Sequence, residues 1–183
     1  MRLFTAIDLP GDVLSNLERL LKRLRPTARV KWSPPDNLHI TTKFIGEWPG
    51  ERLGEIEAAL SALPRQGPIP VAIRGVGFFP NPHSPRVFWA GIQAPPELGS
   101  LAAATDAALA GLGIEPEKRA FSPHLTLARI KEPVPMQTLR ETIAAMPSLE
   151  FGEFVADRFY LYQSRLNPSG SVYTKLSEYP LSK

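Results

Sequence analysis

Apolar residues recur every three or four positions in some parts of the chain and follow a shorter period in others. The helical spacing is clearest over residues 13–24, where the apolar positions are Val13, Leu14, Leu17, Leu20, Leu21 and Leu24. Weaker versions of this spacing run from Leu53 to Leu63, from Leu98 to Leu112 and from Leu139 to Met146. The sequence therefore predicts helices in these four places.

Runs rich in apolar and β-branched residues lie between these helices and are typical of strands. They cover residues 2–9, 38–45, 69–79, 86–93, 123–130, 151–164 and 171–179, of which 151–164 holds one strand or two. Short turns join several runs, such as the stretch Asn167-Pro168-Ser169-Gly170. Because strands outnumber helices, we expect an α+β architecture of largely antiparallel sheets with helices packed on one face.

The order of these segments repeats once along the chain. Arg2-Leu3-Phe4-Thr5-Ala6-Ile7 resembles Arg86-Val87-Phe88-Trp89-Ala90-Gly91-Ile92, and a helix, a strand and a second helix follow each stretch. Two copies of a strand–helix–strand–helix–strand unit predict two pseudo-symmetric lobes and not a solenoid. We expect one two-lobed domain over residues 1–183, with internal repeats of approximately 2–79 and 86–162 and a site between the lobes.

Two of the three histidines occupy the same short pattern, once in each repeat. The patterns are His39-Ile40-Thr41-Thr42 and His124-Leu125-Thr126-Leu127, each within a predicted strand. Residues two apart in a strand point to the same face, so each pattern presents an imidazole beside a hydroxyl. Two such pairs facing each other would supply a general acid, a general base and two donors for an anion, enough to cleave a phosphoester without a metal. An alternative is that both histidines are half-buried strand residues with structural hydrogen bonds.

Composition narrows the class of protein. The chain has 183 residues, 43% of them hydrophobic, a net charge of +3 and no cysteine. The absence of cysteine excludes disulfides and thiolate metal sites, and mild positive charge suits a polyanionic substrate. No apolar run approaches the length of a membrane span, and Asp8 and Pro10 interrupt the first apolar run early. We expect a cytoplasmic monomer that has no contact with membranes and no metal or other cofactor.

The paired motifs and their surroundings resemble the 2H phosphoesterase superfamily, which is named for two His-x-Thr motifs. Within it, the chain is similar to the bacterial and archaeal RNA 2′,3′-cyclic phosphodiesterases, historically called 2′-5′ RNA ligases. The resemblance covers nearly the whole chain, and its most specific segments are Arg2 to Pro10, Leu38 to Thr41, Arg86 to Gly91, Phe121 to Arg129 and Leu161 to Ser164.

The resemblance implies a bilobal fold of two antiparallel sheets with a cleft between the lobes, and hydrolysis of an RNA-terminal 2′,3′-cyclic phosphate to a 2′-phosphate. His39 would be the general acid and His124 the general base, although the near-symmetry of the sequence leaves their order open. Thr41 and Thr126 would bind the phosphoryl oxygens. Ligation through a 2′-5′ linkage, hydrolysis of small cyclic phosphates, metal-dependent hydrolysis and non-catalytic RNA binding are the alternatives.

Three further basic segments are candidates for substrate contact. Arg129 would be a third phosphate ligand because a guanidinium matches phosphate geometry. It lies five residues after His124, so a regular strand would turn it to the opposite face, and only a twist or bulge would bring it back. Lys43 is expected on the face of the first motif, near the anion or in solvent. Lys118 and Arg119, close to Phe121, would contact RNA or lie in a solvated loop.

Overall fold

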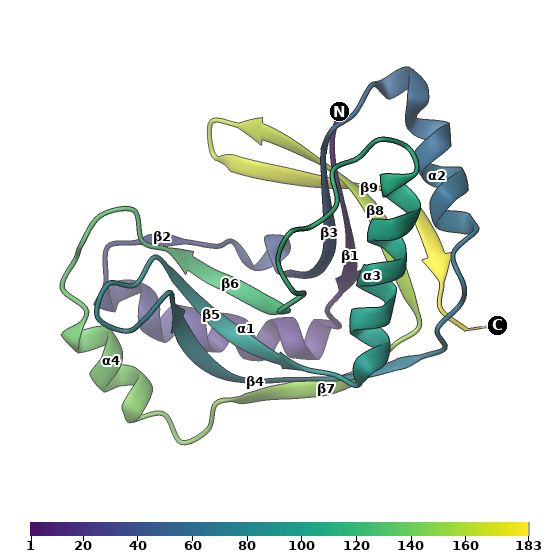
Figure 1. Ribbon diagram of the computed structural model, residues 1–183. Coiled ribbons are helices and arrows are strands. Elements are labelled where there is room, and N and C mark those ends of the chain that lie inside the picture. The colour runs from purple at the N-terminus through teal and green to yellow at the C-terminus, as the bar shows by residue number, and fades with distance from the viewer. Residues whose placement is uncertain (183) are drawn as a thin grey trace.

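Strands from both halves of the chain build two antiparallel sheets in the computed structural model, which describes residues 1–182 (Figure 1). The strands are β1 (Arg2–Asp8), β2 (Lys31–Trp32), β3 (His39–Glu47), β4 (Ile69–Phe79), β5 (Val87–Gln93), β6 (His124–Arg129), β7 (Glu150–Ala156), β8 (Arg158–Asn167) and β9 (Gly170–Pro180). The helices are α1 (Gly11–Leu24), α2 (Leu53–Ser61), α3 (Pro96–Ala110) and α4 (Gln137–Ala144), with single 3₁₀ turns η1 (Arg25–Thr27), η2 (Pro35–Asn37) and η3 (Gly50–Arg52).

The two sheets share one plan. The first has the strand order β3-β1-β8-β9 and the second has the order β2-β6-β5-β4-β7. In the first sheet, β1 from the first half of the chain pairs with β8 from the second half. In the second sheet, β5 from the second half pairs with β4 from the first half. Each lobe therefore contains a strand that the other half of the chain supplies, and the α+β prediction with two antiparallel sheets is confirmed.

The helices cover the two sheets in pairs, as Figure 1 shows. Helices α2 and α3 lie against the first sheet, where α3 packs on β3, and α1 and α4 lie against the second, where α1 packs on β7. The apolar face of α1 is fully buried and includes Leu17, Leu20 and Leu21. Alternate residues of the strands, such as Ile40 of β3 and Leu125 of β6, face the same core. No helix within residues 1–182 has the length and apolarity needed to cross a membrane.

Three places show where the observed elements depart from the predicted runs or resolve what those runs left open. The two-residue strand β2 was not predicted, because two residues carry no periodicity. The stretch 151–164 divides at Asp157 into β7 and β8, which belong to different sheets. Helix α3 ends at Ala110, and Leu112 lies in the following turn, where it still packs against the core. Apolar spacing thus continued past the end of the helix because a turn can also bury its side chains.

Candidate active site

The two motif strands meet where the two sheets come together. Both histidines are the first residue of their strand, His39 of β3 and His124 of β6. Cα atoms of the two strands approach within 8 Å, and Figure 1 shows the beginnings of β3 and β6 near each other. The segment between β2 and β3 crosses from the second sheet to the first. Ser33 in this segment donates its hydroxyl to the carbonyl oxygen of Thr126 at 2.8 Å. This crossing brings the first motif to the second.

His39 lies in a largely buried polar and aromatic setting. Its side chain is 11% exposed, and its Nε2 lies 3.7 Å from Oδ1 of Asp8, the residue directly opposite in β1. Its ring centroid is 4.7 Å from that of Tyr162 and 5.8 Å from that of Tyr173. Its Nδ1 is buried toward the backbone of Asn37 without closing a hydrogen bond of ordinary geometry. The nitrogen that faces an acidic partner is therefore Nε2.

Opposing effects act on the protonation of His39. Burial lowers its pKa below the ordinary histidine value, because an apolar surrounding disfavours the charged ring. The carboxylate of Asp8 acts in the opposite direction and is the largest influence that raises this pKa. The protonation of this ring is therefore sensitive to any charge placed beside it, such as that of an anion.

His124 has different surroundings. It is exposed, and its Nδ1 lies 3.0 Å from the carbonyl oxygen of Ser122. A carbonyl can only accept, so the neutral ring carries its proton on Nδ1 and leaves Nε2 free to accept one. That tautomer is the one a general base requires.

Thr41 and Thr126 lie half-buried on the faces of their histidines. Neither hydroxyl bonds to another side chain or backbone group within residues 1–182. By contrast, the hydroxyl of the neighbouring Thr42 is buried and lies 2.6 Å from the hydroxyl of Thr5. The two motif hydroxyls are therefore available to an incoming anion, whereas Thr42 belongs to the core.

A bulge in β6 returns Arg129 to the face of the second motif. Phe88 pairs with Ala128 but the next residue of β5 pairs with Thr126, so Leu127 is an extra residue in the register. Leu127 and Ala128 are both buried and Arg129 is exposed, which shifts the alternation by one position. The strand therefore has the irregularity that the predicted phosphate contact of Arg129 requires. Lys31 stands opposite Arg129 in β2 and adds a second positive charge to this edge.

Strand β3 carries the same bulge at the equivalent position. Thr5 pairs with Lys43 and Ala6 pairs with Thr41, so Thr42 is the extra residue. Lys43 consequently turns inward, whereas Phe44 returns to the face of His39 with 66% of its surface exposed. Both expectations for Lys43, near the anion or in solvent, are wrong, because they assumed a regular strand.

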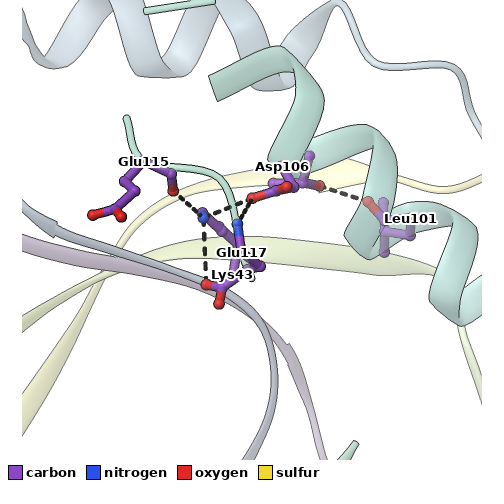
Figure 2. A network of polar contacts seen from close by, with 6 residues as sticks. Lys43, Leu101, Asp106, Glu115 and Glu117 are labelled. Atoms are coloured by element: carbon purple, nitrogen blue, oxygen red, sulfur yellow. Dashed lines mark hydrogen bonds and ion pairs between the residues drawn. The ribbon is translucent and has the colours of Figure 1, made fainter. Parts of the chain in front are cut away.

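Lys43 is 3% exposed and ties β3 to the segment that leads into the second motif (Figure 2). Its Nζ donates to Asp106 of α3 at 2.7 Å, to the carbonyl oxygen of Glu115 at 2.9 Å and to the carboxylate of Glu117 at 3.3 Å. The carboxylate of Asp106 also accepts from the backbone N–H of Glu117. The lysine thus fixes residues 115–117 against the first motif strand.

Two further groups of residues are the polar neighbours of His39 and the basic pair that was a candidate for RNA contact. Asp8, Tyr162 and Lys175 form a polar cluster beside His39 that was not predicted, because three different strands bring these residues together. Lys118, which pairs with Glu115 at 3.2 Å, and Arg119 both lie exposed outside regular secondary structure.

Known proteins resemble this chain along its whole length. A family model described as LigT-like phosphoesterase matches residues 7–89 and 92–173. A protein of Archaeoglobus fulgidus named RNA 2′,3′-cyclic phosphodiesterase is 39% identical over 176 residues, which are 96% of this chain and 98% of the relative.

Two solved structures share the fold. The structure of TT0787 from Thermus thermophilus matches with a TM-score of 0.82 and 35% identity, covering 99% of this chain and 98% of the other. Escherichia coli LigT in complex with 3′-AMP matches with a TM-score of 0.80 and 26% identity, covering 100% and 98%.

Two antiparallel sheets whose paired His-x-Thr strands begin side by side define a 2H phosphoesterase fold. The chain belongs to the LigT-like phosphoesterase family. It is therefore an enzyme of the phosphoesterase class, and the resemblance drawn from its motifs is confirmed.

Proposed function

We propose that this protein hydrolyses RNA-terminal 2′,3′-cyclic phosphates to 2′-phosphates with His39 as general acid and His124 as general base. The main support for the proposal is that the two bulged His-x-Thr strands approach each other where they begin (Figure 1). Each strand has a threonine hydroxyl, free of protein hydrogen bonds within residues 1–182, on the face of its histidine. Relatives named RNA 2′,3′-cyclic phosphodiesterase support the substrate class, and the E. coli LigT structure in complex with 3′-AMP supports a ribonucleotide ligand.

The reaction needs one proton acceptor and one proton donor. Nε2 of His124 takes a proton from water while that water's oxygen attacks phosphorus. The bond from phosphorus to the 3′ oxygen breaks, and Nε2 of His39 gives its proton to that oxygen, which leaves a 2′-phosphate. Each positioned transfer typically contributes about 10²–10⁴-fold in rate. The two rings exchange charge in the step, and solvent restores both afterwards.

The remaining site residues hold the phosphate. Thr41 and Thr126 donate their hydroxyls to the non-bridging oxygens, on which charge grows as water attacks. Arg129 supplies a guanidinium to the same group. Side chains of the protein thus stabilise the negative charge that develops on the phosphate, and no metal enters the proposed step.

Product analysis of 2′,3′-cyclic AMP tests this proposal. The protein is incubated with the substrate in excess chelator, and the products are separated by chromatography against authentic 2′-AMP and 3′-AMP. We expect 2′-AMP alone, at a rate that the chelator does not change. Formation of 3′-AMP would contradict the assigned leaving group, and loss of turnover in chelator would contradict the metal-free mechanism.

An oligoribonucleotide with a cyclic end, assayed in parallel, tests the substrate class. Faster turnover of the oligonucleotide than of the mononucleotide supports RNA ends, and the reverse supports small cyclic phosphates. Binding of the oligonucleotide without turnover of either substrate would contradict the enzymatic proposal and favour an RNA-binding role.

A further inference from the structure

We propose that Asp8 is a positioning residue for this reaction, whose carboxylate orients Nε2 of His39 and favours the protonated ring that a general acid requires. This inference rests on the proposed two-histidine hydrolysis and separates roles that the nearly symmetric motifs do not distinguish. Asp8 does not touch the reacting atoms in this proposal and acts only through His39.

The geometry follows from strand pairing. Asp8 is the last residue of β1 and His39 the first residue of β3, and the two stand directly opposite in the antiparallel register. Directly opposite side chains share a face of the sheet. Oδ1 of Asp8 lies 3.7 Å from Nε2 of His39, close enough for a charge interaction and far enough to leave this nitrogen accessible to a substrate oxygen.

Other strands hold the carboxylate in place. The hydroxyl of Tyr162 on β8 donates to Oδ1, and Nζ of Lys175 on β9 lies 2.6 Å from Oδ2. Burial and the neighbouring Asp8 raise the pKa of Tyr162, so its hydroxyl stays a donor. The Lys175 ammonium also lies 4.0 Å from the ring centroid of Tyr160. With both oxygens engaged, Asp8 cannot turn away from the histidine without breaking two contacts.

Few charged groups act on the ring of His39. Asp8 from β1 and the more distant Asp36 from η2 favour the charged form, whereas Lys175 from β9 and burial oppose it. The rings of Tyr162 and Tyr173 pack against it. Because burial prevails and the pKa of His39 is already lowered, removal of Asp8 would leave the ring neutral over more of the working pH range.

The second motif has no such carboxylate. The residue opposite His124 is Gly91 of β5. A side chain there is blocked, because a Cβ on Gly91 would lie 2.5 Å from the carbonyl oxygen of Arg74. Within residues 1–182, no carboxylate comes within 4 Å of the ring nitrogens of His124. The acid side and the base side of the site are therefore built differently at the same register position.

The test compares Asp8→Asn with the wild type in pH profiles of kcat/KM for 2′,3′-cyclic AMP. One limb of this profile is set by the pKa of His39 and the other by the general base. We expect the limb set by His39 to move to lower pH by about one unit, while the other limb stays in place. Asp8→Glu, which keeps a carboxylate, should move the limb back toward the wild-type position.

Asp36→Asn is the matched control, since it removes an exposed and more distant carboxylate and should leave the limb within about 0.3 units. A profile for Asp8→Asn that is lowered uniformly at every pH, with neither limb moved, would show a merely structural role and overturn the inference.

A direct titration of His39 by nuclear magnetic resonance separates this inference from the proposed function. The imidazole resonances of His39 are followed against pH in the wild type and in Asp8→Asn, with no substrate present. A lower His39 pKa in the variant supports the inference even if the wild type turns over no cyclic phosphate, and an unchanged pKa overturns it even if the wild type is active.

Discussion

At the residue scale, a shared motif does not produce shared surroundings. His39 and His124 begin equivalent strands, but one is largely buried opposite a carboxylate and the other is exposed opposite a glycine. The contact between Nδ1 of His124 and the carbonyl oxygen of Ser122 selects the tautomer of that ring. In the proposed mechanism, the groups around the two histidines therefore distinguish the acid from the base, and the motif itself does not.

Phe44 and Arg129 occupy equivalent positions after the two bulges, one apolar and one cationic. The ring of Phe44 is exposed on the face of His39, with its centroid 6.1 Å from that of the buried Phe4. Exposed aromatic rings beside a nucleotide site provide surfaces on which a base can stack. Under the proposed function, we therefore expect Phe44 to face the nucleobase and Arg129 to face the phosphate.

Phe44→Ala should raise KM for 2′,3′-cyclic AMP about tenfold, because base stacking contributes about 1–3 kcal/mol. The free energy of unfolding should change by less than about 0.5 kcal/mol, since the side chain is exposed. Steady-state kinetics and urea denaturation measure the two effects. Leu166→Ala, an apolar residue that is 77% exposed at the β8–β9 hairpin, is the matched control and should change neither quantity. An unchanged KM in Phe44→Ala would contradict the assignment.

At the element scale, the bulges in β3 and β6 decide which residues belong to the site. Each inserts one residue directly after the threonine, so two successive side chains enter the core and the next one returns to the surface. In β3 this change of alternation buries Lys43 against α3 and connects the first motif to the segment before the second (Figure 2). The bulge in β3 therefore places Phe44 on the face of His39 and Lys43 in the interior.

Lys43→Met should destabilise the fold by about 2 kcal/mol at neutral pH, because the buried hydrogen bonds to Asp106 and Glu115 are lost. The hydrogen bond from Lys43 lowers the pKa of Asp106. A lowered carboxyl pKa stabilises the fold above the ordinary value of that pKa, and this contribution disappears as the pH falls through the lowered value. The difference from the wild type should therefore shrink below about pH 4.

Urea denaturation at pH 7 and pH 3 measures this difference. The control is Lys118→Met, which removes an exposed lysine paired with Glu115 and should cost less than about 1 kcal/mol at either pH. Equal losses of stability in the two variants at pH 7 would contradict the structural role of Lys43.

The same elements show what sequence could and could not predict. Apolar spacing located the helix from Val13 to Leu24, and the motif located both histidines. Neither signal predicted that Lys43 is buried. The faces to which successive side chains of a strand point depend on its register, and the bulge in β3 is a feature of strand pairing that the sequence does not reveal. The bulge in β6 also returns Arg129 to the face of the second motif. From the sequence alone, this placement could be given only on the condition that the strand twists or bulges.

At the scale of the whole molecule, the strand order supports the proposal that the chain contains two related halves. β3-β1-β8 in the first sheet corresponds to β6-β5-β4 in the second, with β8 and β4 exchanged between the halves. No pattern along the sequence predicts this exchange, because it depends on which strands pair in space. It also explains why the Asp8 cluster was not predicted, since Tyr162 and Lys175 come from the far end of the chain.

The site lies where the two sheets meet. β3 is an edge strand of the first sheet, β6 lies next to the edge of the second, and the two strands contact each other. This arrangement supports the proposal that two histidines far apart in sequence act on one phosphate and that neither half holds a complete site. Loss of either histidine should consequently remove the reaction rather than halve it.

The most direct test of this account is single-turnover hydrolysis of an oligoribonucleotide ending in a 2′,3′-cyclic phosphate, in excess chelator, by the wild type, His39→Ala and His124→Ala. His83→Ala, which alters the third histidine in an exposed turn, is the control. The account predicts that each motif variant loses about 10²–10⁴-fold in rate, while His83→Ala matches the wild type. Retention of more than a tenth of the wild-type rate by either motif variant would contradict two-histidine catalysis.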